Sequence, residues 1–200
     1  AHGLSLDVHR PASADGSAAL VVFFYGGSWQ NGSRARYAFA GRALAARGVV
    51  AVVPDYRLYP AVRFPAFMHD AARAVAWAHA NARALGADPA RVHVLGHAAG
   101  AQIAALLASD PRYLAGDPPF LLLHGGDDGT VWPIHSEKMT ATLREAGIPV
   151  RLHLYPGMGH IRPLLALRYP RLAPVLTDTL DFIDGPGRSA KARQEPVGGR

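Results

Sequence analysis

The 200-residue chain has no cysteine, which excludes disulfides, thiolate metal sites and a cysteine nucleophile. It has no run of about 18 apolar residues, so the sequence predicts no transmembrane helix and no membrane partner. The first residues show no basic segment followed by an apolar one, so no signal peptide is expected, and the cytoplasm is favoured as the location. H-E-x-x-H, P-loop and G-x-G-x-x-G motifs are also missing, so neither a metal nor another cofactor is expected.

Acidic residues are outnumbered, 15 Asp and Glu against 21 Lys and Arg, and the formal net charge is +6. Half of this excess lies in the last sixteen residues, whose charged side chains are Arg188, Lys191, Arg193, Arg200 and Glu195. No basic stripe with interleaved aromatic residues is present, so nucleic-acid binding is not expected. We predict one domain over residues 1–184 and a basic, disordered tail over residues 185–200. The oligomeric state is left open.

Apolar runs of strand length alternate with helical patterns along most of the chain. Strands are expected near residues 4–8 and at 18–25, 49–53, 92–95, 120–124 and 150–155, and helices at 33–47, 65–85, about 100–108, 136–146 and 172–183. Such alternation predicts an α/β fold with a mostly parallel sheet covered by helices on both faces. In such folds the chemistry lies at the carboxyl ends of the strands.

The turn after the strand at 92–95 reads Gly-His-Ala-Ala-Gly over residues 96–100. This is the frame G-x-S-x-G with Ala98 in the serine position. Glycines at such a strand–helix corner permit a strained turn that exposes the middle side chain. The amide of Ala99 then lies at the start of a helix, where the dipole favours an anion. Taken alone the pattern is weak, because small residues are common at such corners.

Three other strand ends carry matching features. Gly26 and Gly27 follow the strand at 18–25, and they are either an ordinary turn or a source of free amides for a developing oxyanion. A carboxylate, Asp127 or Asp128, follows the strand at 120–124, and His160 follows the last strand. The order of nucleophile position, acid and base is the chain order of the α/β-hydrolase triad. The four loops together therefore favour a hydrolase.

These segments resemble α/β-hydrolase esterases, in particular the carboxylesterase group with hormone-sensitive-lipase-like and feruloyl-esterase-like enzymes. The matching segments are residues 23–29 (FFYGGSW), 54–58 (PDYRL), 96–100 (GHAAG), 124–131 (HGGDDGTV) and 157–160 (GMGH). The resemblance covers about residues 4–183. It implies an α/β-hydrolase fold and a serine-hydrolase-type carboxylesterase that acts on a small-molecule ester through an acyl-enzyme.

The resemblance also assigns residues to roles. It implies that Ala98 occupies the nucleophile position, that Asp128 is the acid and that His160 is the base. The oxyanion amides would come from Gly26, Gly27 and Ala99. Asp128 is preferred over its neighbour because the family motif places the carboxylate four residues after its histidine. The residues expected to line a substrate pocket are Ser28, Trp29, Tyr56, His97, Trp132 and Met158. Asp55 and Arg57 are expected to brace their loop, together with Asp70.

The sequence departs from the family pattern at three places. Tyr25 replaces a common histidine, and the methyl group of Ala98 cannot attack a carbonyl carbon. The connection 109–119 is too short for the further strand and lid that the family places there, so either the protein lacks them or the printed sequence omits them. We interpret the chain as an esterase inactivated by replacement of its serine. A natural, catalytically dead binding protein and an arylformamidase-type amide hydrolase are the alternatives.

Overall fold

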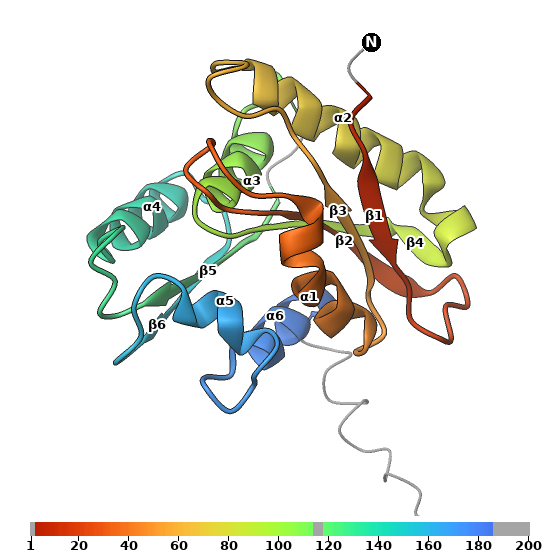
Figure 1. Ribbon diagram of the computed structural model, residues 1–200. Coiled ribbons are helices and arrows are strands. Elements are labelled where there is room, and N and C mark those ends of the chain that lie inside the picture. The colour runs from red at the N-terminus through yellow and green to blue at the C-terminus, as the bar shows by residue number, and fades with distance from the viewer. Residues whose placement is uncertain (1–2, 114–117, 186–200) are drawn as a thin grey trace, which may run out of the picture.

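The computed structural model describes residues 3–113 and 118–185 (Figure 1). The strands are β1 (Leu6–His9), β2 (Ala18–Phe24), β3 (Val50–Pro54), β4 (Ala87–Gly96), β5 (Phe120–Gly125) and β6 (Val150–Tyr155). The helices are α1 (Arg34–Ala45), α2 (Ala66–Asn81), the short 3-10 helix η1 (Arg83–Leu85), α3 (Ala99–Ser109), α4 (Ile134–Glu145), α5 (Arg162–Ala166) and α6 (Val175–Asp184). Apart from its first residue, the predicted tail lies outside the described residues.

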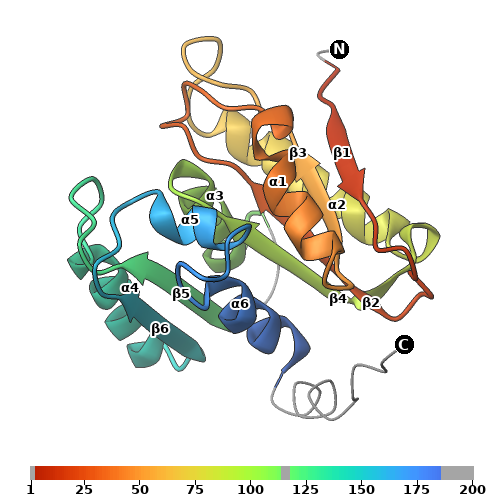
Figure 2. The ribbon, with the colours of Figure 1, turned by 60° about the horizontal axis from the view of Figure 1, so that its bottom comes forward.

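The predicted α/β fold with mostly parallel strands is confirmed. β2 pairs in parallel with β3 and β4, and β1 adds an antiparallel edge, so the strand order is β1-β3-β2-β4. β5 and β6 form a separate parallel pair, and the two sheets lie next to each other (Figure 2). The expectation of one parallel sheet is therefore corrected. The described residues between α3 and β5 contain no strand that could bridge β4 and β5, because that connection is short.

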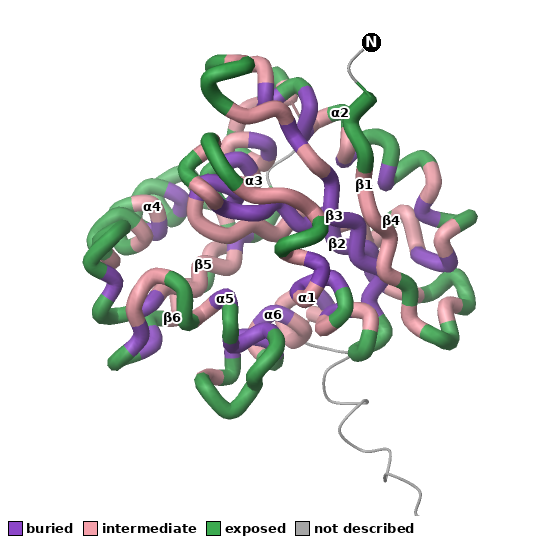
Figure 3. The backbone as a smooth tube through the Cα atoms, in the orientation of Figure 1, coloured by how far each residue is buried: buried purple, intermediate pink, exposed green. Residues whose placement is uncertain are grey.

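The core lies around the two central strands, β2 and β3. Their side chains over residues 20–24 and 50–53 are at most 1% exposed, and the tube is coloured as buried along both strands (Figure 3). α1 packs on one face of this sheet, while α2 and α3 contact each other on the opposite face (Figure 1). Coverage on both faces explains why these strands are continuous apolar runs rather than alternating patterns.

Several elements differ from the sequence prediction, among them β4, which begins at Ala87 rather than near residue 92, and α2, which ends at Asn81 before the short helix η1. The last helix begins at Val175 rather than at residue 172, since Pro174 occupies its N-cap position. The short helix α5, directly after the loop that carries His160, was not predicted. A five-residue helix contains too few turns to show a 3.6-residue periodicity, so sequence patterning cannot reveal it.

A buried ion pair braces the loop that follows β3. The side chain of Asp70 is 0% exposed and accepts hydrogen bonds from Arg57 Nε at 2.8 Å and Arg73 Nη2 at 2.7 Å. The predicted brace between Arg57 and Asp70 is confirmed. Asp55 does not join it, because its carboxylate pairs with Arg34 instead.

Replacing Asp70 by Asn is expected to lower the free energy of unfolding by about 2–4 kcal/mol at pH 7, since two guanidinium groups lose their carboxylate. Burial alone would raise the pKa of Asp70, but the bonds from Arg57 and Arg73 outweigh it and the pKa is lowered. The stabilisation is therefore present above about pH 4 and lost as the pH falls through the folded-state pKa. Urea unfolding of parent and variant should differ at pH 7 and converge towards pH 3. An equal difference at both pH values would contradict this assignment.

Candidate active site

A strained turn joins β4 to α3. Ala98 has φ 50° and ψ −117°, a backbone conformation that costs a non-glycine residue about 1–3 kcal/mol. The flanking glycines are required by close packing. A Cβ atom on Gly96 would lie 2.1 Å from the carbonyl oxygen of Gly100, and one on Gly100 would lie 2.0 Å from that of Phe24. This strained strand–turn–helix is the geometry of a nucleophile elbow, as the sequence predicts.

The loop after β2 lies against this elbow. A Cβ atom on Gly26 would lie 2.9 Å from Nδ1 of His97 and 3.0 Å from the Cβ of Ala98. Gly27 has φ 131°, and its carbonyl oxygen accepts the amides of Gln30 and Asn31 at 3.0 and 2.9 Å. These bonds fold the loop into a tight turn, and Gly26, directly before it, contacts the elbow.

The backbone amides of Gly26, Gly27 and Ala99, where the loop meets the elbow, differ in their surroundings. The backbone of Gly26 lies beside the hydroxyl of Tyr37, where it partly offsets the rise in the pKa of Tyr37 that burial causes. The amides of Gly27 and Ala99 donate to no acceptor within residues 3–113 and 118–185. Of the three predicted oxyanion donors, Gly27 and Ala99 therefore have amides that are free to bind a ligand oxygen.

Tyr25, the residue before Gly26, holds the loop after β2 in place through buried contacts. Its ring is 1% exposed and stacks on Tyr56 and Tyr37 with centroids 4.6 and 5.5 Å apart. Its hydroxyl donates to Asp55 at 3.1 Å, and the hydroxyl of Tyr56 donates to the carbonyl oxygen of Tyr25 at 2.7 Å. Burial raises the pKa of both phenols, so they remain neutral donors. The sequence alone did not predict that Tyr25 holds this loop, although its position directly before two glycines indicates a residue at the start of the turn.

His160 and Asp128 form a direct pair at the ends of β5 and β6. His160 Nδ1 lies 2.8 Å from Asp128 Oδ2, the contact that the implied roles of base and acid require. The other carboxylate oxygen accepts the amides of Thr130 and Val131 at 2.8 and 2.9 Å. Burial alone would raise the pKa of Asp128, but these bonds together lower it. The neighbouring Asp127 is exposed.

His97 connects this pair to the elbow. Its Nε2 lies 3.3 Å from the carbonyl oxygen of His160, and the two rings have centroids 5.3 Å apart. A carbonyl oxygen only accepts, so Nε2 carries the proton, while the buried Nδ1 has no partner among the described residues. Burial lowers the pKa of His97 and keeps the ring neutral. His97 thus packs beneath the site.

The other residues predicted to line a pocket lie at different depths. Trp132 is 64% exposed, whereas Tyr56 and Met158 are each 3% exposed. Ser28 is exposed and Trp29 is half-buried beside Phe67, with ring centroids 6.4 Å apart. Tyr56 and Met158 therefore belong to the packed layer beneath the loops and are not accessible to a ligand.

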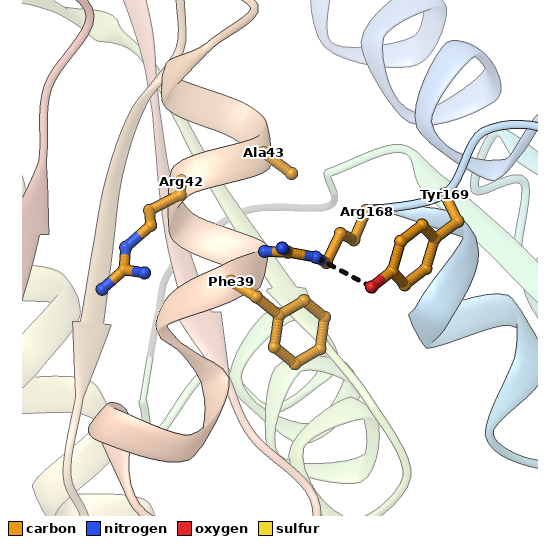
Figure 4. Close-up of a pocket in the computed structure, with 5 residues that line it drawn as sticks. All are labelled: Phe39, Arg42, Ala43, Arg168 and Tyr169. Atoms are coloured by element: carbon orange, nitrogen blue, oxygen red, sulfur yellow. Dashed lines mark hydrogen bonds between the residues drawn. The ribbon is translucent and has the colours of Figure 1, made fainter.

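A cavity of about 350 Å³ lies elsewhere, between α1 and the segment after α5 (Figure 4). It is lined by Phe39, Arg42, Ala43, Arg168 and Tyr169, with Nε of Arg168 donating to the hydroxyl of Tyr169 at 3.2 Å. This lining has no serine, threonine or cysteine, no carboxylate and no imidazole, so the cavity lacks the groups of a serine-hydrolase site. Within the described part of the chain, no cluster of three or more His, Cys, Asp or Glu side chains could hold a metal ion. No described helix is long and apolar enough to cross a membrane.

Gly26→Ala is expected to separate the loop from the elbow, because its Cβ would meet the backbone oxygen of His97 at 2.9 Å. Overpacking of this kind costs about 1–3 kcal/mol of stability. Gly129→Ala is the matched control, since a Cβ there meets nothing within 4 Å, and its unfolding free energy should stay within about 0.5 kcal/mol of the parent. Thermal unfolding measures both variants. Equal stability of the two would contradict the close approach.

Comparison with solved structures identifies the fold class. Est2, an esterase from Thermogutta terrifontis, superposes with a TM-score of 0.77 at 23% identity over 92% of this chain and 90% of that chain. Its propionate-bound form matches with a TM-score of 0.75 over 90% of this chain and 89% of that chain, at 24% identity. The fold is therefore the α/β-hydrolase fold.

The chain belongs to the BD-FAE family, whose family model matches residues 6–114. The model of the prolyl oligopeptidase family matches residues 108–183. Esterase LipC of Mycobacterium tuberculosis is 42% identical over 103 residues, or 49% of this chain and 25% of the relative. The isoprenylcysteine alpha-carbonyl methylesterase ICME of Arabidopsis thaliana is 35% identical over 114 residues, or 56% of this chain and 27% of the relative. The chain thus spans about a quarter of the length of these two relatives.

Proposed function

We propose that this protein has the active site of a carboxylic ester hydrolase in which Ala98 replaces the nucleophile serine, so that the chain forms no acyl-enzyme. The hydrogen bond of 2.8 Å between His160 and Asp128 carries this proposal. Ala98, the residue after the His97 that contacts His160, keeps the strained backbone of an elbow. A strained residue and a buried carboxylate–imidazole pair at one place are typical of an acyl-transfer site.

The arrangement supports a defined mechanism once a serine stands at position 98. The hydroxyl oxygen attacks the ester carbonyl carbon while Nε2 of His160 takes the proton. Negative charge on the carbonyl oxygen is stabilised by the amides of Gly27 and Ala99. His160 then protonates the departing alcohol. In the second half of the reaction His160 takes a proton from water, the water oxygen attacks the acyl-enzyme, and His160 returns the proton to the serine as the acid leaves. Asp128 keeps His160 in the required tautomer throughout.

The relatives suggest the substrate class. LipC is named as an esterase and ICME as a methylesterase, and Est2 has been solved with butyrate and with propionate. We therefore expect small carboxylic esters as substrates and no cofactor. Ser28, Trp29 and Trp132 are the predicted pocket residues that remain accessible, and they would contact the acyl or alcohol group.

A substrate panel on the Ala98→Ser variant tests this function. Hydrolysis of p-nitrophenyl acetate, propionate and butyrate should exceed hydrolysis of aryl formamides. Preference for the formamides would instead support the amide-hydrolase alternative.

Ala98 itself favours a second function, in which the protein binds an ester or acid without converting it. Tryptophan fluorescence of the parent chain, titrated with butyrate, would report such binding through Trp29 and Trp132. A folded Ala98→Ser variant that hydrolyses nothing in the panel, together with saturable butyrate binding by the parent, would establish this second function.

A further inference from the structure

Asp128 faces a second imidazole besides His160. His124, on β5, places its Nε2 3.3 Å from Asp128 Oδ2, the oxygen that His160 also contacts. The same Nε2 lies 2.9 Å from the carbonyl oxygen of Val131. Because that carbonyl oxygen only accepts, Nε2 carries the proton. His124 Nε2 thus donates its N–H to the carbonyl oxygen of Val131, and Asp128 Oδ2 lies within ion-pair distance of the same nitrogen.

The other nitrogen of His124 is also occupied. Nδ1 lies 2.7 Å from Oγ of Ser136, in the first turn of α4. With the proton on Nε2, Nδ1 of the neutral ring accepts, so the hydroxyl of Ser136 donates. The side chain of His124 is 11% exposed, and water therefore competes little for either nitrogen. Ser136 sets both the orientation and the tautomer of this ring.

We propose that His124, oriented by Ser136, is a positioning residue for the Asp128–His160 pair; this inference rests on the proposed function. The hydrogen bond from His124 to the carbonyl oxygen of Val131 closes the loop after β5. The amide of Val131 in turn donates to Asp128 Oδ1 at 2.9 Å. The N–H end of the His124 ring, 3.3 Å from Oδ2, stabilises the carboxylate anion and helps to hold it in line with His160 Nδ1. The chain of contacts runs Ser136, His124, Asp128, His160.

This role predicts a specific loss. Without the imidazole, the loop after β5 loses the hydrogen bond to the carbonyl oxygen of Val131 and Asp128 loses a polar contact at Oδ2, so His160 is oriented less well. Neither His124 nor Ser136 would touch the substrate. The effect should therefore fall on kcat, by about 10- to 100-fold as for other partners that orient a functional imidazole, while KM stays the same.

Kinetics in the Ala98→Ser background test the proposal. His124→Phe should lower kcat by about 10- to 100-fold, and Ser136→Ala should lower it less. His124→Gln, whose side-chain amide can place an N–H near the position of Nε2, should recover most of the activity. His135→Phe alters an exposed histidine on α4 and should have no effect. Unchanged kcat in His124→Phe, or an equal loss in the Gln and Phe variants, would overturn the proposal.

A spectroscopic measurement on the chain with Ala98 needs no catalysis. The proton between His160 Nδ1 and Asp128 should give a far-downfield NMR resonance, which His160→Ala assigns by removing it. His124→Phe should shift or broaden this resonance, and His135→Phe should leave it in place. If the resonance responds but Ala98→Ser hydrolyses no ester, the proposed function fails and the positioning contact stands. If esters are hydrolysed but neither kcat nor the resonance responds, only the role of His124 fails.

Discussion

Ala98→Ser is expected to raise the rate of p-nitrophenyl butyrate hydrolysis by about 10⁴- to 10⁶-fold over the parent chain, the range lost when a triad member is removed from a serine hydrolase. The increase should be this large because the rest of the site is assembled. The elbow already has its strained backbone, and His160 is already paired with Asp128 at 2.8 Å. Initial rates measure the effect, and labelling by a phosphonate ester should reach one equivalent per chain only in the variant.

The control for this prediction adds the same hydroxyl group nearby. Ala101 lies on α3 and is exposed, so Ala101→Ser should be as inactive as the parent and should not be labelled. Activity in both variants would point to a contaminating esterase. An inactive Ala98→Ser variant with parent-like thermal unfolding would contradict the hydrolase reading and favour the binding protein.

Asp128→Asn, introduced together with Ala98→Ser, is expected to reduce kcat by about 10⁴-fold, because an amide in place of the carboxylate leaves the imidazole in the wrong tautomer. The fold should survive, since the remaining side-chain oxygen can still accept the amides of Thr130 and Val131. Steady-state kinetics with p-nitrophenyl butyrate measure the loss.

Asp127→Asn is the matched control for this change, because it makes the same substitution at the adjacent, exposed position. Its kcat should lie within about twofold of the Ala98→Ser variant, as expected for a surface change. A large loss in Asp127→Asn with little loss in Asp128→Asn would show that the neighbouring carboxylate is the acid. The hydrogen bond between Asp128 and His160 would then have a structural role only.

Sequence patterning determined which segments form the strands and helices, and which loops at the strand ends carry the site residues. The apolar runs at 18–25 and 49–53 became the central strands, because a strand covered on both faces must be apolar throughout. The glycines at 96 and 100 predicted the elbow, since close backbone contact excludes a Cβ atom at both positions. The strand ends predicted that Asp127 or Asp128 would lie near His160, because parallel strands bring their carboxyl ends to one edge, and the family resemblance selected Asp128.

Tertiary structure alone decided which strands hydrogen-bond and which side chains meet. Periodicity is a local signal and carries no information on partners, so it did not show that β4 and β5 belong to separate sheets. Tyr25 lies in a motif, but its role in holding the loop depends on two other rings that stack on it. His124 had a known place in a motif, but its role depends on contacts with Ser136 and Asp128 across a turn. Such contacts arise from folding in three dimensions, and no spacing along the chain specifies them.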